Sequence, residues 1–165
     1  SADTSTMVSD LARLRALPRE DSARLGQGLP VLQGLLDLSA GHAAVVVARL
    51  GPLARYGEDD GTNLDRVPAA WARWLVADCY GQLGRSDSAI AYLRLAIADT
   101  GLASGHLALR GLLLPFGRRE LARDYDRAGN HVDAAMEWRA LSDLFSNPDS
   151  RGQEMAGEAR RALAH

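Results

Sequence analysis

Residues 69–98, AAWARWLVADCYGQLGRSDSAIAYLRLAIA, decide the fold of this chain. Their apolar positions recur every three or four residues in two runs, which is the period of a helix with one buried face. Gly84 separates the two runs, and Ser86-Asp87 is typical of a helix N-terminus. The stretch therefore predicts two helices, 69–83 and 86–98, joined by a tight turn.

The same helical period continues on both sides of this stretch. It predicts further helices over 8–17, 20–38, 43–53, 117–128, 132–145 and 153–164, and a run of apolar residues over 107–114 leads up to Pro115. Turn residues gather at 57–68 and 99–105, which predicts loops there, and Pro115 and residues 146–149 predict breaks between helices. Gly41 fits the left-handed position that closes a helix, and Pro52 should perturb its helix near the end.

Composition supports an all-α fold. Apolar residues make up 47% of the 165 residues but aromatic residues only 5%, and Ala, Leu and Val suit closely packed helices. The length suits one compact domain. We expect an N-terminal tail and short helix over 1–19 and one helical domain over 20–165, closed by an amphipathic C-terminal helix.

Charge and hydropathy exclude two classes of partner. The net charge is −2, with 19 basic residues, all of them Arg, so no basic field is expected to gather nucleic acid. No run of apolar residues is long enough for a membrane span, and residues 1–10 lack the order of a signal peptide. We therefore expect a soluble, cytoplasmic protein. The start at Ser1, without Met, is typical of a piece of a larger protein or a processed form.

Two segments share one spacing of small and large residues. The first is Val76-Ala77-x2-Tyr80, Gly84, then Ala89-x3-Leu93-x2-Ala96. The second is Leu121-Ala122-x2-Tyr125, Gly129, then Ala134-x3-Trp138. This pattern resembles the tetratricopeptide repeat, in which small residues let two helices approach and large ones fill the gap to the next pair.

A weaker copy lies upstream, with Gly34 at the small position, Gly41 at the turn and Val46-x3-Leu50 on the second helix. The two better copies are offset by 45 residues, against roughly 34 in the family, so about eleven residues are inserted near 107–115. The arrangement also resembles the C-terminal repeat regions of large bacterial regulatory proteins. The resemblance implies antiparallel helical hairpins stacked as an α-solenoid with a C-terminal capping helix, and a scaffold role.

The resemblance also implies that the first helix of each hairpin lines a concave face that binds a protein or peptide. The residues expected on that face are Val31, Leu35, Trp71, Trp74, Asp78, Phe116, Arg119, Arg123 and Arg127. The three arginines, spaced i, i+4, i+8, would form one stripe able to grip carboxylates or phosphates. The alternatives are that they pair with Glu120, Asp124 and Asp126, and that the tryptophans pack in the core.

No pattern of a catalytic, metal or cofactor site occurs. His42, His106, His131 and His165 are far apart in the sequence, and none has the spacing of a metal motif. The single cysteine, Cys79, cannot form an intramolecular disulfide and is expected to be a small buried residue. We therefore expect no enzyme, no metal and no cofactor.

Three kinds of function remain open. The first is a protein interaction module that holds a peptide or partner domain in the concave groove. The second is a homodimeric assembly element that pairs through residues 107–116 and the last helix. The third is a small-molecule sensor lined by Trp71, Trp74 and Phe116.

Overall fold

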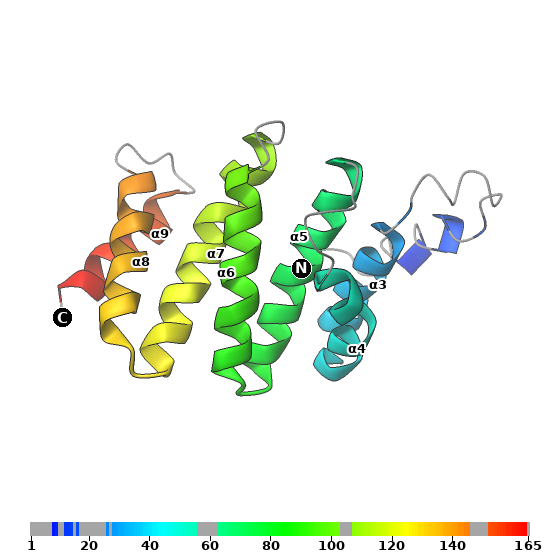
Figure 1. Ribbon diagram of the computed structural model, residues 1–165, viewed down its shortest axis with the longest axis horizontal. Helices are drawn as coiled ribbons and strands as arrows, with labels where there is room; N and C mark the ends of the chain where they lie inside the picture. The colour runs from blue at the N-terminus through cyan, green and yellow to red at the C-terminus, as the bar shows by residue number, and fades with distance from the viewer. Residues whose placement is uncertain are drawn as a thin grey trace. The chain divides into compact units, whose positions relative to one another are not determined.

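The structure, a computed structural model, describes residues 8–9, 12–14, 16, 26, 28–55, 63–102, 107–145 and 152–164, with side chains at 63–67 and 99–113 left aside. Throughout these ranges the chain forms helices and turns, and they contain no strand (Figure 1). The all-α prediction is confirmed. Contacts divide the chain into two compact units, Ser1–Leu83 and Gly84–His165.

In the described part of unit 1 the main helices are α3 (Gly28–Ser39), α4 (Ala43–Ala54) and α5 (Asn63–Gln82). Helix α4 packs against both α3 and α5, and α3 also contacts α5. The fully buried side chains of this unit come from α4 and α5: Val46, Leu50, Leu75, Val76 and Cys79. Among the N-terminal residues, 8–9 and 12–14 are helical, inside the predicted short helix.

Unit 2 contains α6 (Ser86–Leu102), α7 (Leu107–Arg127), α8 (His131–Leu144) and α9 (Gly152–Leu163). Each helix packs against the next, so α7 contacts α6 and α8, and α9 packs mainly on α8 (Figure 1). The core combines small and large side chains from all four helices: Ala89, Leu93, Leu121, Ala122, Tyr125, Ala134, Trp138, Leu141, Ala156 and Ala159.

Three glycines close helices, as predicted for Gly41. Gly41, Gly84 and Gly129 have φ angles of 79°, 71° and 76°, a left-handed conformation that side chains with a Cβ rarely adopt. After α7, the Gly129 N–H donates to Asp126 O (3.0 Å) and the Asn130 N–H donates to Tyr125 O (2.8 Å). These are the paired bonds of a Schellman motif, which satisfies carbonyls at the helix end.

The predicted break at Pro115 is wrong. Helix α7 runs without interruption from Leu107 to Arg127, with Pro115 inside it. An interior proline removes one backbone hydrogen bond and crowds the preceding turn, at a cost of about 3 kcal/mol. Pro115 is buried, and contacts of α7 with α6 and α8 offset that cost. The apolar run at 107–114 and the helix expected over 117–128 therefore belong to one helix.

Two predicted loops are also shorter than expected. Helix α5 begins at Asn63 and includes Pro68, although 57–68 was expected to be a loop. Helix α6 continues to Leu102, beyond the predicted end at residue 98. The helix expected over 20–38 is also shorter than predicted, because α3 begins at Gly28 and Gly26 is a turn residue with a φ of 46°. The expected break at 146–149 lies outside the described residues.

Candidate functional site

The residues predicted to bind a partner lie on two helices. Trp71, Trp74 and Asp78 belong to α5 of unit 1, and Phe116, Arg119, Arg123 and Arg127 belong to α7 of unit 2. Each group is therefore described within its own unit. Of the other two residues expected on the concave face, Val31 is buried in unit 1 and Leu35 is half-buried.

The two tryptophans on α5 contact each other edge to face. Their ring centroids are 5.8 Å apart and the rings are inclined by 87°, which is a favourable geometry for aromatic pairs. Both side chains are half-buried, between the buried residues Ala70, Ala72 and Arg73. Asp78, one turn further along α5, is also half-buried and accepts a hydrogen bond from Gln82 Nε2 (3.2 Å).

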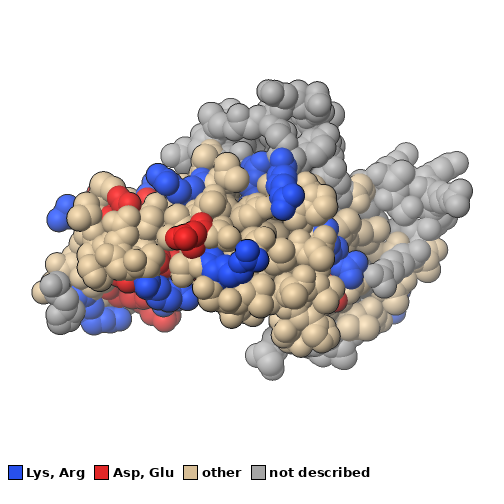
Figure 2. Space-filling model, turned by 60° about the horizontal axis from the view of Figure 1, so that its bottom comes forward, with Lys and Arg blue, Asp and Glu red and all other residues tan. Residues whose placement is uncertain are grey.

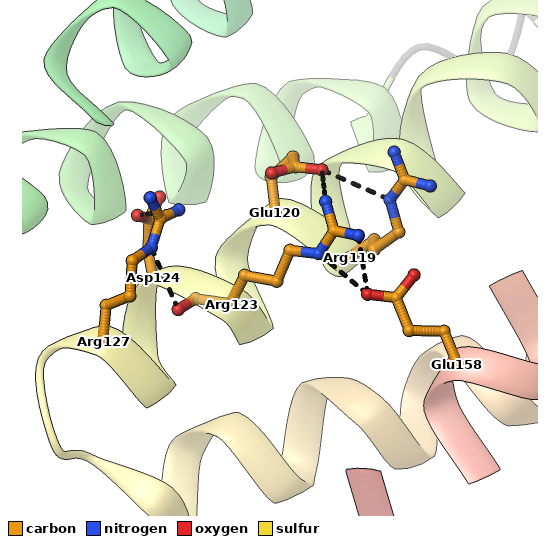
Figure 3. A network of polar contacts seen from close by, with 6 residues as sticks. All are labelled: Arg119, Glu120, Arg123, Asp124, Arg127 and Glu158. Carbon is orange, nitrogen blue, oxygen red and sulfur yellow. Dashed lines mark hydrogen bonds and ion pairs between the residues drawn. The ribbon is translucent and has the colours of Figure 1, made fainter. Parts of the chain in front are cut away.

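The arginine row on α7 begins beside an aromatic ring. The guanidinium carbon of Arg119 lies 5.4 Å from the centroid of Phe116, a cation–π contact. Glu120 Oε1 then accepts hydrogen bonds from Arg119 Nε (3.2 Å) and Arg123 Nη1 (2.9 Å) (Figure 3). One carboxylate thus holds two of the three guanidinium groups.

Arg123 has a second partner from a distant helix. Glu158 Oε1, on α9, lies 2.8 Å from Arg123 Nε and 2.7 Å from Nη2 (Figure 3). Burial acts to lower the pKa of the Arg123 guanidinium, but the hydrogen bonds and negative charges of Glu120 and Glu158 raise that pKa overall. Arg123 therefore stays charged while it links α7 to α9.

Arg127 pairs with a buried carboxylate. Its Nη2 lies 2.7 Å from Asp124 Oδ1, and its Nε donates to the Arg123 carbonyl (3.3 Å). The Asp124 side chain is only 4% exposed, whereas the Arg127 side chain is 53% exposed. Arg127 is therefore a charged partner for a carboxylate that is otherwise shielded from water inside unit 2.

The sequence anticipated only part of this network. Pairing of the arginines with Glu120 and Asp124 is present, but the carboxylate of Asp126 accepts a hydrogen bond from Trp138 Nε1 (3.0 Å) and lies 3.3 Å from His131 Nδ1. Asp126 therefore faces α8 instead of the arginine row. Glu158 was missed, because it is 35 residues from Arg123 and no local spacing signals such a pair.

Cys79 is fully buried in unit 1. Burial, with a smaller effect of the neighbouring Asp78 carboxylate, raises the pKa of its thiol from 9.0 to about 11. The thiolate is the reactive form of cysteine, so a thiol with this pKa is a poor nucleophile at neutral pH. Cys79 is a packing residue of α5.

Metal ligands do not gather anywhere in the described part of the chain, which contains no group of three or more His, Cys, Asp or Glu placed to hold an ion. His42 and His131 are exposed beside turns, and His106 and His165 lie outside the described residues. On the face shown in Figure 2, described basic and acidic side chains are interspersed with uncharged ones. None of the described helices is both long and apolar enough to cross a membrane.

Comparisons with protein-family models, with curated proteins and with solved structures found no match to this chain. The function must therefore be argued from the residues of the two units.

Proposed function

We propose that this chain is a non-catalytic interaction module of tetratricopeptide-like helical hairpins, and that the arginine row on α7 binds a carboxylate-bearing segment of another protein. The observation that carries the proposal is the row itself. Arg119, Arg123 and Arg127 follow one another on a single helix, and the side chains of Arg123 and Arg127 are 42% and 53% exposed. Partly exposed guanidinium groups in a row can meet successive carboxylates of a peptide.

The hairpin architecture is supported by the turns and the small residues. The turns at Gly41 and Gly129 are so short that antiparallel packing of the helices they join is the natural outcome. At Gly34, a Cβ would lie 2.6 Å from Leu50 Cδ1, so α3 and α4 approach closely at the small position of the repeat pattern. With α7 continuous over 21 residues, the residues inserted relative to the family would lengthen the first helix of a hairpin.

The chemistry of the row favours carboxylates as the ligand. A guanidinium presents donors in a planar fork that matches the two oxygens of a carboxylate, and Arg119, Arg123 and Arg127 already bind the carboxylates of this chain. The half-buried Trp71 and Trp74 on α5 are proposed to give unit 1 an apolar contact surface for a partner. The buried, protonated thiol of Cys79 supports a non-catalytic role.

The test is a binding titration with two blocked peptides, hexaglutamate and hexaglutamine, followed by fluorescence anisotropy. We expect hexaglutamate to bind more tightly than hexaglutamine. Replacing Arg123 and Arg127 together by Gln should weaken hexaglutamate binding about tenfold or more, since hydrogen bonds between charged groups contribute about 1.5–3 kcal/mol each.

The matched control is Arg139→Gln, because Arg139 is exposed on α8 and makes no ion pair with the described residues. It should change hexaglutamate binding by less than about twofold. Equal binding of the two peptides, or an equal loss in the control and in the α7 variant, would remove the arginine row from the proposal.

Two other functions remain predictions. Self-association was expected through residues 107–116 and the last helix, but the apolar residues Met155 and Ala156 of α9 are buried within unit 2, and side chains at 107–113 lie outside the description. The small-molecule sensor needs Trp71, Trp74 and Phe116, which are divided between the two units. The peptide-binding proposal is therefore preferred.

A further inference from the structure

We propose that Glu158 on α9 competes with the partner for Arg123, so that α9 restrains the binding site on α7. This inference rests on the proposed function, because it assumes that a carboxylate of the partner binds Arg123. It goes beyond that function by assigning α9 a regulatory role and by naming the residue that carries it.

The geometry of the pair supports competition. The edge of a guanidinium formed by Nε and one terminal nitrogen normally receives both oxygens of a carboxylate. Here Glu158 Oε1 alone receives Arg123 Nε (2.8 Å) and Nη2 (2.7 Å). Its second oxygen makes no ion pair or hydrogen bond with the described residues, so a partner carboxylate could bind this edge through both oxygens and make the better contact.

The third nitrogen of the Arg123 guanidinium is also engaged. Its Nη1 donates to Glu120 Oε1 (2.9 Å), and that oxygen is shared with Arg119 Nε. A partner that takes both edges would have to displace two carboxylates, whereas a partner that takes the Nε–Nη2 edge displaces Glu158 alone. Glu158 is therefore the direct competitor.

The ion pair between Arg123 and Glu158 is exposed enough for a partner carboxylate to replace Glu158. The side chains of Arg123 and Glu158 are 42% and 23% exposed, so water screens their attraction and the net stabilisation of such a pair is modest. Displacing Glu158 would therefore cost the partner little binding free energy. Glu158 should reduce the affinity of the partner several-fold but should not block binding.

The packing of α9 in unit 2 is also compatible with partial detachment of this helix from α7. Its buried face contains Gly152, Met155, Ala156 and Ala159, of which only Met155 has a large side chain. Helix α9 packs mainly on α8 and contacts α7 only slightly. The link from Glu158 to Arg123 is therefore a substantial part of what holds α9 to α7, and its loss should make the amides of α9 exchange faster.

The experiment compares hexaglutamate binding to the native chain, to Glu158→Gln and to Glu154→Gln. Glu154 is the matched control, because it is an exposed carboxylate in the first turn of the same helix and makes no ion pair with the described residues. Both variants lose one negative charge, but only Glu158→Gln removes the carboxylate from the Nε–Nη2 edge of Arg123. We expect Glu158→Gln to bind about three- to fivefold more tightly, and Glu154→Gln to bind within about twofold of the native chain.

A second measurement separates competition from a general charge effect. Hydrogen–deuterium exchange of α9 should become faster when hexaglutamate saturates the native chain. In Glu158→Gln the exchange of α9 should be fast from the start and should change little on binding.

The inference is overturned if Glu158→Gln and Glu154→Gln gain equally in affinity for hexaglutamate. It is also overturned if peptide binding leaves the hydrogen–deuterium exchange of α9 in the native chain unchanged. If Arg123→Gln weakens binding but Glu158→Gln has no effect, the proposed function stands and this inference fails. If hexaglutamate binds none of these proteins, the proposed function fails and the inference fails with it.

Discussion

Helices α3 and α4 of unit 1 approach closely at Gly34, because glycine has a hydrogen atom in place of a side chain. The Cβ of an alanine there would lie 2.6 Å from Leu50 Cδ1, and Leu50 is fully buried, so its side chain has little room to move. Gly157 on α9 is different, because its nearest neighbour is the flexible end of Arg161 at 3.4 Å. Substitution by alanine should therefore have opposite effects on the free energy of unfolding at Gly34 and at Gly157.

We predict that Gly34→Ala lowers the free energy of unfolding by about 1–2 kcal/mol, since overpacking a core costs about 1–3 kcal/mol and alanine regains part of this as helix propensity. Gly157→Ala should raise it by about 0.5–1 kcal/mol. Urea denaturation followed by circular dichroism measures both. A stabilising Gly34→Ala would show that α3 and α4 are not in close contact there.

Cys79 gives a prediction about pH. Burial raises the pKa of its thiol from 9.0 to about 11 in the folded chain, so as the pH rises the unfolded state loses this proton first. The contribution of the buried thiol to the free energy of unfolding is complete below pH 9 and is lost as the pH rises to about 11, a change of at most about 2.7 kcal/mol.

Native chain and Cys79→Ala should therefore be compared by urea denaturation at several pH values in this window. The native chain should lose more stability than the variant, which lacks the thiol but keeps every other side chain. Parallel losses in the two proteins would mean that the thiol is not held in its protonated form by burial.

At the scale of the helices, capping defines the start of α8. Asn130 Oδ1 accepts a hydrogen bond from the Asp133 N–H (3.3 Å), and Asn130 Nδ2 donates to the Asp133 carboxylate (2.6 Å). Asn130→Ala should lower the free energy of unfolding by about 1 kcal/mol, because it leaves an N–H of the first turn without its acceptor. Thermal unfolding should show that Asn130→Ser, which keeps a side-chain acceptor, recovers most of the loss.

The helices also show what local sequence could predict. The 3.6-residue period predicted the helical character of the described chain but not all of the helix ends, and the left-handed conformation predicted for Gly41 is confirmed. The breaks predicted at prolines are wrong, because Pro115 lies inside α7 and Pro68 lies inside α5. A rule based on local hydrogen bonding cannot include the packing that keeps a helix continuous through a proline.

The candidate site follows the same logic. The i, i+4, i+8 spacing placed Arg119, Arg123 and Arg127 on one helix, and the nearby carboxylates Glu120 and Asp124 could be anticipated as partners. Glu158 could not, because it reaches Arg123 only through the packing of α9 in unit 2. Contacts between helices that are far apart in sequence determine how much of the arginine row is open to a partner.

At the scale of the whole molecule, unit 2 is the part that we propose recognises an acidic segment. The side chains of Arg119, Arg123 and Arg127 are balanced by Glu120, Asp124 and Glu158, so the row has no large excess of positive charge. Binding should therefore depend on geometry and on exchange of carboxylates, with a moderate dependence on salt.

The most direct test of this claim is a titration of the native chain with hexaglutamate, followed by amide NMR. We predict that the largest shifts fall between Phe116 and Arg127 of α7 and around Glu158 of α9, and that they are lost in Arg123→Gln. Shifts centred on the exposed Val132 and Met136 of α8, or shifts unchanged by Arg123→Gln, would contradict it.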